Sequence, residues 1–146
     1  MDIFFIEGYF IIERHEIILD LIKFFRQKNH AKVGLTLSAT FMIQNFYDRM
    51  KEIADLSDLI FCNEDEAECF AGLNSKDPEV NSLAIHRKLK QNENRVVIVT
   101  CGKDPVIISK FNYLTNQFEF VIKSFVPLVQ SDDIVDTNGC GDCINI

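Results

Sequence analysis

The segment Asp136–Asp142 has the residue types needed to transfer a charged group. Gly139 and Gly141 are separated only by the small residue Cys140, so several backbone N–H groups can point at one place. A helix beginning there would add partial positive charge at its amino end. Such a site can stabilise phosphoryl oxygens, while the carboxylate of Asp142 accepts a proton from an attacking hydroxyl. The spacing therefore predicts phosphoryl transfer, with these glycines, Cys140 and Asp142 as candidate catalytic residues.

Three other interpretations share these residues. Asp136, Asn138 and Gly141 match three positions of an EF-hand calcium loop, but Cys140 stands where that loop needs an oxygen ligand. Cys140 and Cys143 form a C-x-x-C pair of the kind found in redox and zinc sites, but the sequence has no second pair. A simple turn rich in Asp, Asn and Gly is the third alternative.

The elements that must position this segment follow from the alternation of short β-rich runs with helical patterns. We expect strands at Ile3–Ile6, Lys32–Leu37, Leu59–Cys62 and Arg95–Thr100, and helices over Glu13–Asn29, Phe41–Ala54, Glu64–Phe70 and Val80–Leu89. Val106–Lys110 and Phe118–Phe125 predict a terminal antiparallel hairpin. The order indicates an α/β fold with a mostly parallel sheet. The β-branched run Arg95–Thr100 is typical of a strand that is covered on both faces.

Polar residues follow several of the predicted strands. Ser38, Asn63, Thr100 and Gly102 fall at carboxyl ends, where open parallel sheets bind their ligands. The segment after Asn63 is also a good helix start, because Asn is a favourable N-cap and acidic residues suit the positive end of the helix dipole. We expect Tyr9 and Phe24-Phe25 to be core residues.

Composition excludes some classes of function. The net charge of −7, with 22 acidic and 15 basic residues, argues against a general nucleic-acid binder. A single nucleotide can still be held by backbone N–H groups and a metal ion. Apolar runs are too short to span a membrane, and the start Met1–Phe5 has no features of a secretory signal. Five cysteines, an odd number, indicate reduced thiols, so we expect a cytoplasmic protein.

The motif Asp-Thr-Asn-Gly-x-Gly-Asp at Asp136–Asp142 resembles the signature of the ribokinase-like (PfkB-type) carbohydrate and purine kinase family. The Asn after Thr is similar to the adenosine kinase branch of that family. Four upstream segments resemble the same branch in the same order: Phe5–Phe10, Leu35–Phe41, Asn63–Ala67 with an Asn-x-x-Glu motif, and Thr100–Asp104 with a Thr-x-Gly motif.

The resemblance implies a layered αβα fold and transfer of the γ-phosphoryl group of ATP to the 5′-hydroxyl of adenosine, giving AMP for purine salvage. Asp142 would be the base, and Gly139, Cys140 and Gly141 would form the anion hole. Asn63 and Glu66 would organise Mg²⁺. The ATP-binding residues would be Asn63, Thr100, Gly102, Asp136, Thr137 and Asn138. The full-length protein would be a monomer with no nucleic-acid or membrane partner.

The sequence departs from the family pattern in identity and in extent. Cys140 replaces the usual Ala, and Thr36 and Thr40 replace Asn and Pro. Residues 1–146 resemble one partial domain, a carboxy-terminal half without the amino-terminal part that carries most of the acceptor pocket and the lid, and without the final helices. We therefore expect little activity from this chain alone. A sugar kinase of the same family and a non-catalytic polypeptide are the alternatives.

Overall fold

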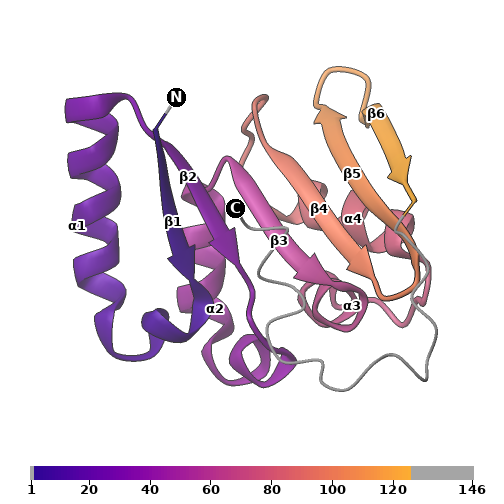
Figure 1. Cartoon of the computed structure of the whole chain (residues 1–146), viewed down its shortest axis with the longest axis horizontal. Coiled ribbons are helices and arrows are strands. Elements are labelled where there is room, and N and C mark those ends of the chain that lie inside the picture. The colour runs from indigo at the N-terminus through magenta and orange to yellow at the C-terminus, as the bar shows by residue number, and fades with distance from the viewer. Residues whose placement is uncertain (1, 126–146) are drawn as a thin grey trace.

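A computed structural model of the chain describes residues 2–125 and contains a six-stranded mixed sheet (Figure 1). The strands are β1 Ile3–Glu7, β2 Lys32–Thr36, β3 Leu59–Asn63, β4 Val96–Cys101, β5 Asp104–Asn112 and β6 Gln117–Ser124. Strands β1 to β4 are parallel, and β5 and β6 add an antiparallel hairpin. The predicted α/β class, the parallel sheet and the terminal hairpin are confirmed.

Local sequence explains where the helices begin and end. They are α1 Ile11–Asn29, preceded by the 3₁₀ turn Gly8–Phe10, then α2 Thr40–Leu56, α3 Glu64–Ala71 and α4 Pro78–Lys88. Asp77 caps α4 ahead of Pro78, which suits the first helical turn. Helix α3 ends at Gly72, whose φ of 68° glycine adopts without a steric penalty.

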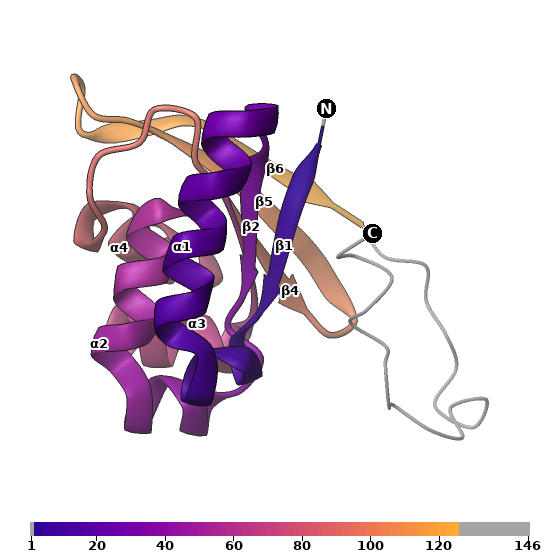
Figure 2. The same cartoon turned by 90° about the vertical axis from the view of Figure 1, so that its left-hand side faces the viewer.

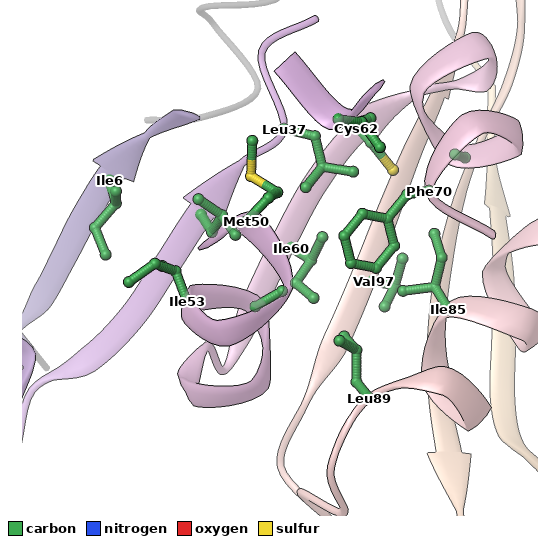
Figure 3. Packing of buried hydrophobic residues seen from close by; sticks show 14 of the residues in the cluster. Ile6, Leu37, Met50, Ile53, Ile60, Cys62, Phe70, Ile85, Leu89 and Val97 are labelled. Carbon is green, nitrogen blue, oxygen red and sulfur yellow. The ribbon is translucent and has the colours of Figure 1, made fainter. Parts of the chain in front are cut away.

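All four described helices cover the same face of the sheet (Figure 2). Their apolar residues pack with the inward-facing residues of β1 to β4 into one buried cluster (Figure 3). It includes Ile6, Leu37, Met50, Ile53, Ile60, Phe70, Ile85 and Val97. Burial of this apolar surface is the main force that holds the helical layer against the sheet.

The opposite face of the sheet is not covered by the described residues. Strand β4 alternates between buried and half-buried residues, so it is covered on one face rather than on both as its sequence predicts. On the uncovered side, Ile3, Phe5, Phe120 and Ile122 are exposed. Phe5 lies over Gly34, where an added Cβ would come within 3.0 Å of the ring.

Helix α1 has apolar residues both in the core and on the surface. Ile18 and Ile22 are buried, whereas Ile17, Leu21 and Phe24 are exposed. The prediction that Tyr9 and Phe24 are core residues is wrong for the described part of the chain, where both side chains are exposed. Phe25 is half-buried and stacks on Phe4. None of the described helices combines the length and apolarity that a bilayer span requires.

Candidate functional site

A hollow of about 940 Å³ lies at the carboxyl ends of strands β1 to β4. This volume is within the range of small-molecule sites, roughly 300 to 1,000 Å³. Its polar and charged lining consists of Glu7, Arg14, Thr36, Ser38, Asn63, Glu66 and Thr100. Its apolar lining includes Phe5 and Phe61 on the uncovered face of the sheet, and Tyr9, Phe10, Ile17 and Leu21 in the turn and helix that follow β1. The hollow therefore has one polar end and one apolar wall.

Asn63 and Glu66 form the most ordered part of the polar end. The side-chain oxygen of Asn63 accepts a hydrogen bond from the backbone N–H of Glu66 at 2.8 Å. In return, the Glu66 carboxylate accepts from the backbone N–H of Asn63 at 3.0 Å and from its side-chain amide at 3.1 Å. This reciprocal capping box confirms the predicted helix start. It also fixes the orientation of an amide and a carboxylate that line the hollow.

The carboxylate of Glu66 is almost completely buried, with 6% of the residue exposed. Burial raises its pKa, the hydrogen bond from the Asn63 backbone opposes the rise, and the negative charge of Asp65 adds to it. A cation in the hollow would favour the charged form. Mg²⁺ prefers oxygen ligands and keeps several of its waters, so this pair fits a water-mediated magnesium contact.

Thr100 is brought to the same place by strand pairing. In the β3–β4 register its Cα lies opposite that of Asn63, so the two residues are neighbours across the sheet. Gly102 does not line the hollow. It lies in the turn between β4 and β5 with a φ of 56°. The structure therefore brings together Asn63, Glu66 and Thr100, with Gly102 two residues beyond.

The glycine-rich segment lies outside the described residues. The predicted roles of Asp136, Thr137, Asn138, Gly139, Cys140, Gly141 and Asp142 therefore stay predictions.

Tyr9 is a site residue that the sequence did not reveal. It follows Gly8 in the 3₁₀ turn and lines the hollow, with 44% of its surface exposed. Its ring centroid lies 5.9 Å from that of Phe41, which is also exposed. Large exposed aromatic rings beside a hollow are suited to stack on a flat ligand. The signal available in the sequence was the position of Tyr9 directly after the glycine that ends β1.

Arg14 is the one basic residue among the described residues that line the hollow. Its guanidinium lies over the ring of Phe10, 5.4 Å from the centroid. Glu7 and Glu66 are the acidic residues in the same lining. The described part of the hollow is therefore short of positive charge for a ligand with several phosphates, which is consistent with the need for a metal ion and backbone N–H groups.

The described cysteines are free thiols, and burial makes Cys62 and Cys101 poor nucleophiles. Burial raises the pKa of Cys101 to about 11, with Glu64 and Asp104 adding to the rise. Burial also raises the pKa of Cys62. Thiols react as thiolates, so these two side chains act as packing residues beneath the polar end of the hollow.

A second polar cluster lies away from the hollow. The hydroxyls of Ser82 and Ser109 are 2.5 Å apart, and Nε2 of His86 is 3.2 Å from the Ser109 hydroxyl. All three residues are fully buried. A substrate could not reach a serine there, so this arrangement is part of the core.

The comparisons with known proteins agree on one family. The family model described as "pfkB family carbohydrate kinase" matches residues 2–145. Adenosine kinase of Schizosaccharomyces pombe is 29% identical over 96% of the chain, and adenosine kinase 2 of Arabidopsis thaliana is 28% identical over 95%. The chain spans about 40% of the length of the first of these relatives and 39% of the second.

Solved structures agree with these relatives. Adenosine kinase of Anopheles gambiae, in complex with P1,P4-di(adenosine-5) tetraphosphate, superimposes with a TM-score of 0.82 at 28% identity. Adenosine kinase of Schistosoma mansoni, in complex with 2-fluoroadenosine, gives a TM-score of 0.79 at 26% identity. In both cases the alignment covers 97% of this chain and 41% of the other chain.

Proposed function

Because the chain belongs to the PfkB family of carbohydrate kinases, we propose that it supplies the phosphate-binding part of an ATP-dependent adenosine kinase. The reaction would move the γ-phosphoryl group of ATP to the 5′-hydroxyl of adenosine, giving AMP and ADP, in purine salvage. The described fold is the ribokinase-like fold of the adenosine kinases. One observation supports the proposal most directly: Asn63 of β3, Glu66 of α3 and Thr100 of β4 line one hollow.

In the proposed site the Asn63–Glu66 pair would hold Mg²⁺ through water. When bound, the ion neutralises phosphate charge and helps to align the transferred group. The chain's own contribution is orientation, because the three hydrogen bonds within the pair fix both side chains before any ligand arrives. Thr100 offers a hydroxyl to a phosphate oxygen from the neighbouring strand.

Asp142 would take the proton from the 5′-hydroxyl as its oxygen attacks the γ-phosphorus. The bond between that phosphorus and the β–γ bridging oxygen then breaks, and ADP leaves with the electron pair. The N–H groups of Gly139, Cys140 and Gly141 would stabilise the charge on the transferring oxygens. Asp136, Thr137, Asn138 and Gly102 would complete the nucleotide contacts.

The apolar wall supports a nucleoside as the acceptor. Tyr9 in this wall, with the Phe41 ring beside it, presents a ring on which a flat base can stack. Such stacking is worth about 1–3 kcal/mol per base. The two structural relatives were solved in complex with P1,P4-di(adenosine-5) tetraphosphate and with 2-fluoroadenosine.

We expect slow turnover from the 146-residue chain alone. The apolar face of the sheet has no cover among residues 2–125, so the hollow is open along one wall. Water then reaches the reacting groups, which weakens electrostatic stabilisation of the transferring phosphoryl group. The full-length protein would act as a monomer in the cytoplasm, and the chain as a single partial domain.

A radiolabel assay with Mg²⁺-ATP and adenosine tests the proposal, beside calorimetric titration of each ligand. Asp142→Asn should lower the rate of AMP formation at least about a hundredfold and leave ATP affinity unchanged. Asp133→Asn, an equal charge change outside the motif, should alter neither. Absence of binding for both ligands would sink the kinase proposal. Phosphorylation of a sugar such as ribose, with adenosine untouched, would replace it with the sugar-kinase alternative.

A further inference from the structure

The carboxyl ends of β1 and β2 are joined by a side chain. The last paired residues of the two strands are Glu7 and Thr36. One residue further along β1, the backbone N–H of Gly8 donates a 2.8 Å hydrogen bond to the hydroxyl oxygen of Ser38. That hydroxyl also lies 3.4 Å from the carbonyl oxygen of Thr36, to which it donates. Ser38 therefore continues the ladder of strand bonds where the main chain has stopped.

The backbone of Ser38 is held in an uncommon conformation. Its φ is 66°, in the left-handed region that non-glycine residues rarely occupy. The N–H of Ala39 bonds to the carbonyl of Leu37 at 2.8 Å, closing a three-residue turn around Ser38. Turns of this type with positive φ are rare and strained, and strain that surrounding structure maintains is concentrated at functional sites.

The backbone of Gly8 lies so close to the Thr36–Ser38 segment that no side chain fits between them. A Cβ on Gly8 would come within 2.8 Å of the Thr36 carbonyl oxygen and 2.9 Å of the Ser38 hydroxyl oxygen. Real Cβ atoms do not approach oxygen so closely. The glycine and the strained serine are therefore two halves of one contact, which we call the Gly8–Ser38 latch.

The latch lies between residues that line the hollow. Glu7, Tyr9 and Phe10 flank Gly8, and Thr36 is two residues before Ser38. Phe41, whose ring meets that of Tyr9, stands in the first turn of α2, three residues after Ser38. Loss of the hydrogen bond between Gly8 and Ser38 would allow the turn that carries Tyr9 to move relative to the segment that carries Phe41.

We propose that Ser38 is a positioning residue, whose hydroxyl holds the Gly8–Phe10 turn so that the Tyr9 ring stays in place for the base of a nucleoside. The identity of that ligand rests on the proposed function. The latch itself is a property of the fold and can be tested separately. The Ser38 hydroxyl bonds to Gly8 and Thr36 rather than to Asn63, Glu66 or Thr100. We therefore expect nucleoside binding to depend on it and ATP binding not to.

Two substitutions distinguish the effect of the Ser38 hydrogen bond from the effect of backbone strain at Ser38. Ser38→Ala removes the hydroxyl and keeps a Cβ in the left-handed region, whereas Ser38→Gly removes the hydroxyl and relieves the strain. Both should raise the amide exchange rate of Gly8, measured by NMR, about tenfold or more. Both should weaken adenosine affinity about three- to tenfold, the equivalent of one ordinary hydrogen bond, with ATP affinity unchanged.

Ser57→Ala is the matched control. Its hydroxyl also makes one 2.8 Å bond to a backbone carbonyl, that of Ile53, and the residue is buried after the end of α2 and does not line the hollow. It should leave Gly8 exchange and adenosine affinity unchanged. The proposed positioning role of Ser38 would be contradicted if the amide exchange rate of Gly8 were unaltered in both Ser38 variants. It would also be contradicted if adenosine and ATP affinity fell equally. A native chain that binds no adenosine would overturn the proposed acceptor, and the exchange result would still decide the latch.

Discussion

Asn63 and Glu66 each satisfy the other's backbone N–H, at 2.8 Å and 3.0 Å, while their side chains line the hollow. The structural role and the proposed ligand-binding role therefore fall on one pair, and substitutions can separate them. Glu66→Gln keeps the size and one oxygen acceptor for the backbone N–H of Asn63, but it removes the charge and the acceptor for the Asn63 side-chain amide. We expect the Mg²⁺-dependent affinity for ATP to fall about tenfold, as for loss of an outer contact to a metal ion. Calorimetric titration with and without Mg²⁺ measures it.

The melting temperature of Glu66→Gln should change little, since removal of an unfavourably buried carboxylate offsets the loss of the hydrogen bond from the Asn63 side-chain amide. Asn63→Ala should instead lower stability by about 1 kcal/mol through loss of the cap. Asp77→Ala removes a comparable cap, from α4, which bonds the N–H of Glu79 at 2.9 Å. It should cost similar stability without affecting ATP. Equal ATP affinity in native protein and Glu66→Gln would exclude Glu66 from the metal site.

His86 makes stability depend on pH. Burial lowers its pKa from 6.5 to about 4, with help from the positive charge of Arg95 and against the hydrogen bond of Ser109. Below pH 6.5 the unfolded chain binds a proton that the folded chain refuses until about pH 4. Stability is thus lost as pH falls across this window, by up to on the order of 3 kcal/mol. Urea unfolding at about pH 7.5 and about pH 5 measures the loss.

His86→Gln keeps a polar group near Ser109 but cannot titrate, so its loss of stability between the two pH values should be smaller. His30→Asn is the control, since His30 is exposed and Asn tolerates its left-handed φ of 50°. It should lose as much stability as the native chain. A His86→Gln profile that parallels the native one would show that His86 does not carry the effect.

Arg95 is fully buried and holds together one end of the sheet. Its guanidinium donates to the carbonyl oxygens of Ala54, Asp55, Ser57 and Lys90 at 2.7 to 3.2 Å. Arg95→Leu would leave these acceptors without their donor, so we expect a loss of at least about 3 kcal/mol in the free energy of unfolding. Arg87→Leu, at an exposed arginine of α4, should cost under about 1 kcal/mol. Similar losses for the two variants would contradict this account.

Tyr9 should contribute to acceptor affinity through its ring rather than its hydroxyl. Tyr9→Ala is expected to weaken adenosine binding by about 1–3 kcal/mol, and Tyr9→Phe by little. Leu114→Ala removes a large apolar side chain that is 92% exposed in the β5–β6 turn and should have no effect. Equal adenosine affinity in Tyr9→Ala and native protein would remove the ring from the binding site.

Patterns among residues that are close in the sequence predicted most of the helices and strands. The capping pair Asn63 and Glu66 is separated by three positions, so its signal is local in the sequence. The run before Thr100 and the hairpin that follows it are recognisable for the same reason. Thr100 lies beside Asn63, as predicted, because parallel strands end at a common edge of the sheet.

Contacts between distant residues were not predictable in this way. The bond from Gly8 to Ser38 spans 30 positions, and that from Arg95 to Ala54 spans 41. Tyr9 and Phe24 were assigned to the core because hydrophobicity indicates that a side chain can be buried, not whether a neighbour is present to bury it. The positive φ of Ser38 has no residue signature, because serine adopts it only where tertiary bonds impose it.

The strands stand in the sheet in the order in which they occur in the chain, from β1 to β6. Each new strand can therefore dock on the edge left by its predecessor, without waiting for a later segment to insert between them. Contacts that close only short stretches of chain form quickly. A ribosome releasing this polypeptide from its amino end would present the strands in the order of assembly, and the sheet could grow while synthesis is still under way.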